Sequence, residues 1–166
     1  INRGVKPIAE IVGYGASADA HHITQPAPGG EGGARAMNKA INGASISKDE
    51  INYINAHGTS TPLNDKFETM AMKSVFGDQA YNISINSTKS MVGHLLGASG
   101  AIEAAVTSLS IKNSMIHPTA NLENSDPECD LDYTPSGFKN LDINYAMSNS
   151  FGFGGHNTSL IFKKFE

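Results

Sequence analysis

Two histidines define the chemistry that this chain could perform. His57 lies in the run 55–61 (NAHGTST) and His94 in the run 87–100 (STKSMVGHLLGASG), both rich in small and hydroxyl side chains. The glycine beside each imidazole allows a ligand or a second backbone to approach closely. Hydroxyl groups and Lys89 supply hydrogen-bond donors. We therefore expect both runs to surround a polar ligand in a tight space.

The positions of the two imidazoles indicate how they could act. We expect His57 at the C-terminal end of a strand, where ligands bind in α/β proteins; the alternative is a turn histidine bonded to its own loop. We expect His94 to begin a helix, whose positive end favours the neutral ring. Its alternative role is to cap a neighbouring carbonyl. Two neutral imidazoles aimed at one carbonyl oxygen would stabilise an enolate.

Zinc binding is another chemistry open to these histidines, with Asp65 or the remaining histidines completing the ligand set. A zinc site needs three or four ligands at recognisable spacing, and the sequence has neither HExxH nor CxxC. We therefore predict no catalytic metal. The other histidines are interpreted as ordinary surface or loop residues, namely His21, His22, His117 and His156.

The hydrophobic pattern alternates between strand and helix periods, which predicts an α/β fold. The expected strands span residues 5–14, 51–56, 81–86, 144–150 and 157–162. The first of these carries apolar residues on both of its faces, so we expect burial on both sides. The expected helices span residues 34–41, 62–76 and 94–112, and the proline- and glycine-rich run 25–33 is expected to be a loop.

The second helix has the most complete set of end signals. Thr61 can cap it, Pro62 suits its first position, and Gly77 ends it. Asp65 and Glu68 favour the positive end of its dipole.

Composition and charge narrow the possible functions. The 166 residues are typical of one compact domain, and a net charge of −4 favours no nucleic-acid partner. No apolar run approaches the ~20 residues needed to cross a bilayer. The single cysteine suits a reducing compartment, so we expect a cytoplasmic protein. Because the chain starts at Ile1 without a signal peptide, we expect it to begin inside a longer protein.

Three motifs together resemble a known family. They are the run 55–62 (NAHGTSTP) with Asp65, the run 87–97 (STKSMVGHLLG) with Glu103, and the run 149–155 (NSFGFGG). In this order and at this spacing they resemble the β-ketoacyl-acyl carrier protein synthases, most closely the type II condensing enzymes of bacterial fatty acid synthesis. Weaker similarity covers nearly all of residues 1–166.

The resemblance implies one half of a thiolase-like fold, with a mixed sheet flanked by helices. It covers only the C-terminal half, and the family's nucleophilic cysteine belongs to the N-terminal half. We therefore expect this fragment alone to be inactive. The complete enzyme, expected to be a homodimer, would elongate an acyl chain by decarboxylative Claisen condensation. Its substrates would be carried on the phosphopantetheine of acyl carrier protein, and it would need no cofactor.

The resemblance also implies roles for individual residues. The catalytic group comprises His57, His94, Lys89 and Phe151, supported by Glu103 and Asp65. The phosphopantetheine arm would contact Thr59, Thr61 and Thr24. A monovalent cation or a water would be surrounded by Asn55, Glu103, Ser148 and Asn149. The ordinary alternatives are a solvated lysine at position 89 and helix-capping roles for the two threonines of run 55–61.

The glycines of run 151–155 suggest a dinucleotide site, but a phosphate-binding loop should open a helix, whereas a strand is expected here. We expect a turn in which Phe153 packs in the core. The resemblance implies that Phe151 is a gate and that its backbone N–H is an oxyanion donor. Carboxylates near Cys129 are expected to raise its pKa and to prevent its acylation.

Two other functions stay open. One is an isolated, non-catalytic domain that serves as a scaffold or binds an acyl-pantetheine arm. The other is a fragment of a polyketide ketosynthase, although the runs 59–65 (TSTPLND) and 130–134 (DLDYT) look more like fatty acid synthesis.

Overall fold

A five-stranded mixed sheet forms the centre of the molecule in the computed structural model, which describes residues 2–135 and 137–165. The strand order is β1-β7-β6-β2-β3, in which β2 is parallel to β3 and β6, and β7 is antiparallel to β6 and β1. The strands are β1 (Ala9–Ala18), β2 (Ile51–Asn55), β3 (Ser84–Asn86), β6 (Tyr145–Gly152) and β7 (His156–Lys164). A second, two-stranded sheet pairs β4 (Met115–Ile116) with β5 (Lys139–Asn140).

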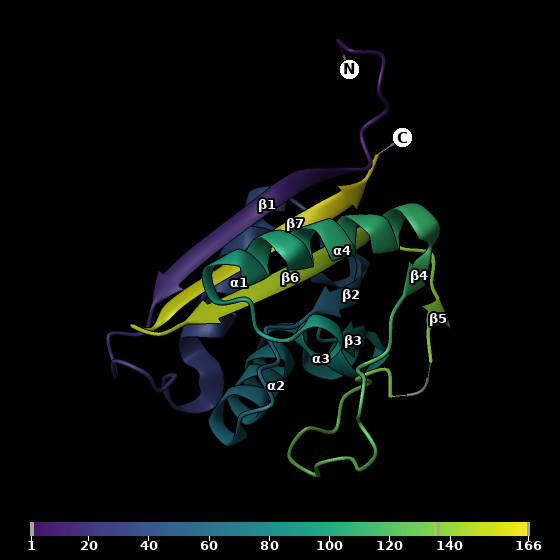
Figure 1. Ribbon diagram of the computed structural model, residues 1–166. Helices are drawn as coiled ribbons and strands as arrows, with labels where there is room; N and C mark the ends of the chain where they lie inside the picture. Colours follow the sequence, from purple (N-terminus) through teal and green to yellow (C-terminus); the bar gives the residue numbers. More distant parts are fainter. Residues whose placement is uncertain (1, 136, 166) are drawn as a thin grey trace.

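Helices cover both faces of the main sheet (Figure 1). The α-helices of the described residues are α1 (Glu31–Ala44), α2 (Pro62–Phe76), α3 (Lys89–Val92) and α4 (Ser99–Asn113). Short 3-10 turns span Pro28–Gly30, Lys48–Glu50, Gly77–Asn82 and Leu96–Ala98. The predicted α/β class and the mixed sheet flanked by helices are confirmed. Over the described ranges, no helix combines the length and the apolar character that a membrane crossing requires.

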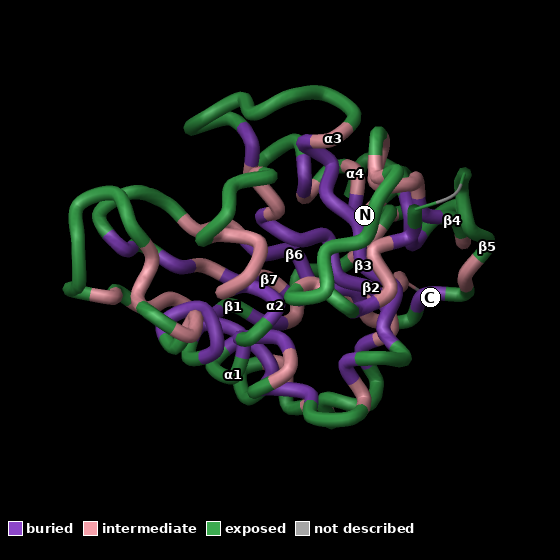
Figure 2. The backbone as a smooth tube through the Cα atoms, turned by 90° about the horizontal axis from the view of Figure 1, so that it is seen from below, coloured by how far each residue is buried: buried purple, intermediate pink, exposed green. Residues whose placement is uncertain are grey.

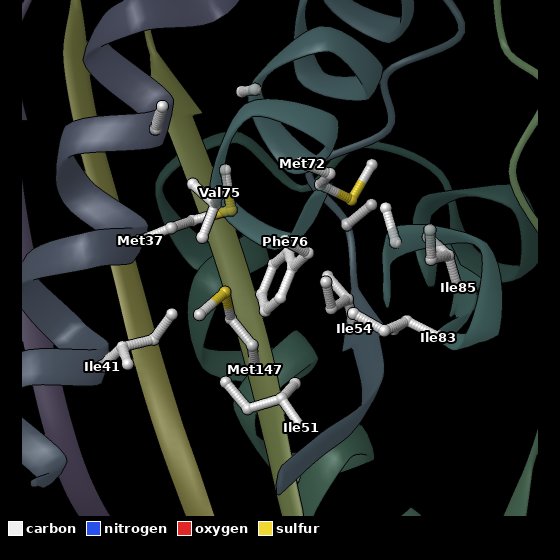
Figure 3. Packing of buried hydrophobic residues seen from close by; sticks show 14 of the residues in the cluster. Met37, Ile41, Ile51, Ile54, Met72, Val75, Phe76, Ile83, Ile85 and Met147 are labelled. Carbon is white, nitrogen blue, oxygen red and sulfur yellow. The ribbon is translucent and has the colours of Figure 1, made fainter. Parts of the chain in front are cut away.

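Adjacent strand residues belong to two separate cores, because successive side chains of a strand point to opposite faces. Ile54 and Met147 pack in the core under α1 and α2, together with Phe76 of α2 (Figure 3). Their neighbours Tyr53 and Ala146 pack in the second core, which also contains Ile111 of α4. The buried stretches of the chain accordingly gather around the sheet (Figure 2).

Helix α1 lies unusually close to β1, and glycine makes this possible. A Cβ atom added to Gly13 would lie 2.4 Å from the carbonyl oxygen of Ala40, and one added to Gly15 would lie 2.0 Å from that of Ala36. Any side chain at these positions would push the helix away. This close approach fixes the position of the N-terminal end of α1, which contributes to the site described below.

The first strand differs from its prediction in both position and burial. It spans Ala9–Ala18 rather than 5–14, and Ile11 and Tyr14 are 60% and 63% exposed. The expected burial on both faces is therefore wrong for this chain by itself. One face packs against α1 through glycines, and the opposite face is largely open because α4 covers mainly β6 and β7.

Other boundaries were predicted with mixed success. Strand β2 and helix α2 have the predicted positions, and Gly77 ends α2 with a positive φ of 61°. Helix α1 begins at Glu31, inside the segment expected to be a loop. The second half of the expected strand 81–86 is β3, whereas Tyr81 and Asn82 end a 3-10 turn. The Thr61 side chain makes no capping hydrogen bond, contrary to its predicted role.

Candidate active site

Glu68 holds the backbone around His57, immediately after β2. Its carboxylate accepts hydrogen bonds from the backbone N–H groups of His57 and Gly58, both at 2.9 Å, and from Asn149 Nδ2 at 3.3 Å. Burial raises the pKa of Glu68, while these N–H donors oppose the rise. The predicted dipole role missed this function. A signal was present, since Glu68 lies beyond the first turn of α2, where the dipole effect fades.

Lys89 determines the tautomer of His57. The Lys89 ammonium lies 3.1 Å from His57 Nδ1, 2.6 Å from the His57 carbonyl oxygen and 2.5 Å from Glu103 Oε1. An ammonium group can only donate, so Nδ1 accepts and Nε2 carries the proton of the ring. Burial, and then the charges of Lys89 and His94, lower the pKa of His57 to about 3, so the ring is neutral at ordinary pH. Lys89 and Glu103 thus form a buried ion pair beside His57.

His94 is held in the same tautomer by its own loop. Its Nδ1 atom accepts the backbone N–H of Leu96 at 3.0 Å, so its proton also belongs on Nε2. Ser99 Oγ accepts the N–H of Leu95 at 2.9 Å and lies 3.1 Å from the same Nδ1. The prediction that His94 begins a helix is wrong, because α4 begins at Ser99. Loop hydrogen bonds, rather than a helix terminus, orient this ring.

The two imidazoles lie side by side with Phe151. The ring centroids of His57 and His94 are 5.7 Å apart at an interplanar angle of 84°, and that of Phe151 is 5.9 Å from His57. Phe151 lies in β6, and a Cβ atom added to Gly33 of α1 would be 2.9 Å from its ring. The aromatic ring therefore fills the space that a glycine leaves open. Among the described residues, neither Nε2 atom has a hydrogen-bond acceptor in the protein.

A cavity of about 780 Å³ adjoins this cluster. Its wall includes His94, Lys89 and the two neighbours of His57, Ala56 and Gly58. The segment 119–135 forms another part of the wall. It is closed at its base by the hydrogen bond from Thr119 N to the Thr134 carbonyl oxygen, at 3.0 Å.

The predicted substrate-binding residues fall into two groups. Thr59 and Thr61 line the cavity, and their hydroxyl oxygens are 3.0 Å apart. Asp65 also lines it and accepts the backbone N–H of Ser60 at 3.2 Å. Thr24 lies outside the cavity wall, in an exposed turn where its backbone N–H donates to His22 at 3.2 Å. The structure thus groups two of the three predicted threonines.

Comparison with known proteins places this arrangement in a family. The family model "Beta-ketoacyl synthase, C-terminal domain" matches residues 8–123, well over half of the chain. The chain belongs to the β-ketoacyl synthase family. It is 57% identical over 164 residues to 3-oxoacyl-[acyl-carrier-protein] synthase 2 of Staphylococcus aureus strain COL, and 54% identical to the Synechocystis protein of that name. These matches cover 99% of this chain but 40% and 39% of the relatives.

Solved structures show the same relationship. A β-ketoacyl synthase from Burkholderia phymatum superposes with a TM-score of 0.93 at 44% identity, covering 99% of this chain and 40% of that one. A type II PKS ketosynthase, in complex with its acyl-carrier protein, gives a TM-score of 0.95 at 40% identity, covering 98% and 40%. The predicted half of a thiolase-like ketosynthase fold is therefore confirmed, and the chain spans about two fifths of the length of these relatives.

The proposed cation site of this ketosynthase chain is only partly open. Asn55 Nδ2 donates to Thr88 Oγ1 at 2.8 Å, and Asn149 Oδ1 accepts from Ser159 Oγ at 2.8 Å. Ser148 is buried and pairs with Asn55 between β6 and β2. Glu103 Oε2 is buried and has no hydrogen-bond partner in the structure. One unpaired carboxylate oxygen fits a water as well as a cation, so this set does not by itself select a cation.

Two further predictions concern Cys129 and Phe153. Burial raises the pKa of Cys129 most, and the neighbouring carboxylates raise it further. This cysteine lines the cavity, but its environment does not favour the thiolate. Phe153 is 78% exposed at the tip of the β6–β7 turn, so its predicted role in core packing is wrong. Within residues 2–135 and 137–165, no group of three or more His, Cys, Asp or Glu side chains could hold a metal ion.

Proposed function

We propose that this chain is the C-terminal part of a 3-oxoacyl-acyl carrier protein synthase of fatty acid synthesis. One observation carries the proposal: two neutral imidazoles, 5.7 Å apart, each have Nδ1 occupied and an unpaired Nε2–H. Two such donors can bind one carbonyl oxygen on which negative charge develops. The 57% identity to 3-oxoacyl-[acyl-carrier-protein] synthase 2, against 40% to the type II PKS ketosynthase, favours fatty acid over polyketide synthesis.

The reaction proceeds by decarboxylation and attack. Nε2–H of His57 and of His94 donate to the thioester carbonyl oxygen of a malonyl group. The bond to its carboxylate breaks, carbon dioxide leaves, and the electron pair forms an enolate that the two donors stabilise. The enolate carbon then attacks an acyl thioester held on a cysteine outside this chain, and the thiolate is released. The protein residues described here supply hydrogen bonds, and the step needs no redox cofactor or metal.

Lys89 and Glu103 keep the first imidazole ready for this step. If His57 were protonated at Nδ1, that proton would face the Lys89 ammonium, 3.1 Å away. The ammonium therefore disfavours the imidazolium and fixes which nitrogen donates. Glu103 balances the buried charge of Lys89 at 2.5 Å. A water or a monovalent cation beside Glu103 Oε2 would complete its contacts without entering the reaction.

The cavity is the proposed path of the carrier's phosphopantetheine arm. Thr59 and Thr61 present hydroxyl groups on its wall, and hydroxyls suit the amide groups of pantetheine. Phe151 is the proposed gate, and its backbone N–H would donate to the second oxyanion. In a solved structure of similar fold, a type II PKS ketosynthase is bound to its acyl-carrier protein. This similarity supports an acyl carrier protein as the partner here.

An N-terminal segment is the second proposed partner, with the complete enzyme acting as a homodimer in the cytoplasm. Helix α4 leaves Ile102 and Leu109 39% and 46% exposed, and Tyr14 on β1 is also uncovered. Covering such apolar surface is favourable. The relatives' additional length supplies a segment of chain that could cover it and bring the nucleophilic cysteine. Without that segment the chain serves at most as a scaffold or an acyl-pantetheine-binding domain.

Decarboxylation of malonyl-acyl carrier protein tests the proposal. The complete enzyme should release carbon dioxide, and His57→Ala or His94→Ala should each lower this rate about a hundredfold or more. Acyl loading of the cysteine should be largely retained in both variants. Equal loss of loading and decarboxylation would contradict the assigned roles. This chain alone should show no turnover, and acylation of Cys129 detected by mass spectrometry would contradict its predicted inertness.

A further inference from the structure

His117 lies in a hydrogen-bonded network, although the sequence suggested an ordinary loop histidine. It follows β4 and lies two residues before the segment 119–135 that lines the cavity. Its Nε2 atom lies 3.1 Å from Thr88 Oγ1, and its Nδ1 atom lies 2.7 Å from the Pro118 carbonyl oxygen. Its own carbonyl oxygen accepts Asn86 Nδ2 at 2.7 Å. The residue is therefore fixed through its backbone and through both ring nitrogens.

The partners determine the direction of every hydrogen bond in this network. A carbonyl oxygen can only accept, so His117 Nδ1 carries a proton. Thr88 Oγ1 already accepts Asn55 Nδ2 at 2.8 Å, and no other acceptor for its hydroxyl is found in the described residues. The hydroxyl is therefore satisfied by donating to an unprotonated Nε2. A directional chain results, running from Asn55 through Thr88 to His117.

Two members of this network, Asn55 and Thr88, lie next in the chain to the segments that carry His57 and Lys89. Thr88 directly precedes Lys89 at the start of α3, and Asn55 closes the strand that delivers His57. Asn55 and Thr88 are fully or almost fully buried, at 0% and 1% exposed, so an unmet hydrogen bond there is costly.

We propose that His117 is a positioning residue that holds the side chains of Thr88 and Asn55, and through these residues the His57–Lys89 pair, in the geometry for decarboxylation. The inference rests on the proposed function and deepens it, because it names a residue outside the three family motifs. Small displacements of catalytic groups are expensive, since a shift of about 1 Å can cost on the order of a hundredfold in rate. A second hydrogen bond, from Ala120 N–H to Ser90 Oγ at 2.9 Å, connects the segment after His117 to α3.

The tautomer can be tested on this chain without any activity assay. Nitrogen-15 NMR of the imidazole rings should show His117 as neutral, with the proton on Nδ1 and Nε2 unprotonated near pH 7.5. Thr88→Val should shift the Nε2 resonance, because that atom loses its donor. A His117 ring that carries its proton on Nε2, or whose Nε2 resonance ignores Thr88→Val, would overturn the network.

The positioning role is tested in the complete enzyme with a pair of matched variants. His117→Leu removes the acceptor, and the decarboxylation kcat should fall about tenfold, the equivalent of one hydrogen bond, with little change in KM. His117→Gln offers Oε1 to the Thr88 hydroxyl and should restore most of the rate. Thr88→Val should lower kcat similarly, and the double variant His117→Leu/Thr88→Val should be no slower than either single variant.

The outcomes separate two kinds of failure. If the complete wild-type enzyme does not decarboxylate malonyl-acyl carrier protein, the proposed function fails. If the wild type is active and His117→Leu keeps its kcat, or His117→Gln is as slow as His117→Leu, only the positioning role fails. Losses at positions 117 and 88 that multiply in the double variant would also contradict action through Thr88.

Discussion

Lys89 Nζ lies 3.1 Å from His57 Nδ1, and both side chains are buried. Because the ammonium donates to Nδ1, this nitrogen carries no proton. The arrangement is stable because Glu103 neutralises the ammonium and the His57 carbonyl oxygen accepts one of its protons. The same geometry that fixes the donor tautomer also opposes protonation of His57. This opposition has a measurable consequence for folding.

We expect this chain to lose stability in mild acid through His57. Burial, and then the charge of Lys89, lower its pKa to about 3 in the folded state from 6.5 for an ordinary histidine, so the unfolded chain binds the proton first. The contribution of neutral His57 is therefore fully present above about pH 6.5 and is lost as the pH falls toward 3. The loss amounts to roughly 1.4 kcal/mol per pH unit within that window.

Urea unfolding of this chain between pH 4 and pH 7 measures that loss. His57→Gln should flatten the pH dependence, whereas His21→Gln, a control at an exposed histidine, should leave it unchanged. An unaltered slope in His57→Gln would show that other groups cause the acid sensitivity.

Glu68 should prove as important as the histidine that it supports. Glu68→Ala leaves the buried N–H group of His57 and the partly buried N–H group of Gly58 without an acceptor. The cost is about 1 to 3 kcal/mol for the buried group and less for the other. Glu68→Gln keeps one acceptor oxygen and should lose less stability. Thermal unfolding of this chain and decarboxylation by the complete enzyme provide the two measurements. Identical behaviour of the Ala and Gln variants would exclude the bidentate role.

The sequence predicted elements whose end signals are local, and it failed where distant chain segments decide. Helix α2 begins at Pro62 and ends before Gly77, as expected, because each residue determines the helix end through its own backbone conformation. Burial of β1 was misjudged, because a hydrophobic pattern does not say which distant segment covers a strand face, and Ile11 and Tyr14 are 60% and 63% exposed.

The candidate site shows the same division. Motif spacing placed His57 and His94 together, but the supporting contacts come from long-range packing. Glu68 reaches His57 from α2, and His117 reaches Thr88 from beyond α4. Only its position beyond the first turn of α2 separates Glu68 from a helix-dipole carboxylate, and no local pattern distinguishes His117 from an ordinary loop histidine.

Phe151 and Phe153 should respond differently to the same substitution. Phe151 packs on Gly33 and His57, whereas Phe153 is 78% exposed. In the complete enzyme, Phe151→Ala should lower the condensation rate. It should also allow malonyl groups to enter before acyl loading is complete. Phe153→Ala should change the melting temperature little, since it removes few packing contacts. Rapid-quench kinetics with long acyl chains provide the measurement. Wild-type kinetics in Phe151→Ala, with only a lower melting temperature, would show that this ring packs without gating.

The exposed face of α4 should matter only when a partner covers it. Leu109 is 46% exposed in this chain, so Leu109→Glu should leave the chain's own melting temperature nearly unchanged. If the N-terminal segment packs on α4, the same carboxylate becomes buried without a partner and should weaken assembly by several kcal/mol. Met70→Glu is the matched control, because Met70 is 43% exposed but lies on α2, across the sheet from α4.

Co-expression of the two segments, followed by size-exclusion chromatography and a decarboxylation assay, measures this assembly. Leu109→Glu should abolish co-elution and activity, and Met70→Glu should preserve both. Normal assembly of Leu109→Glu would show that α4 stays open to solvent in the complete enzyme. Loss of assembly in both variants would point to general sensitivity of the surface to charge. Only the selective loss supports α4 as the layer that the two parts of the enzyme share.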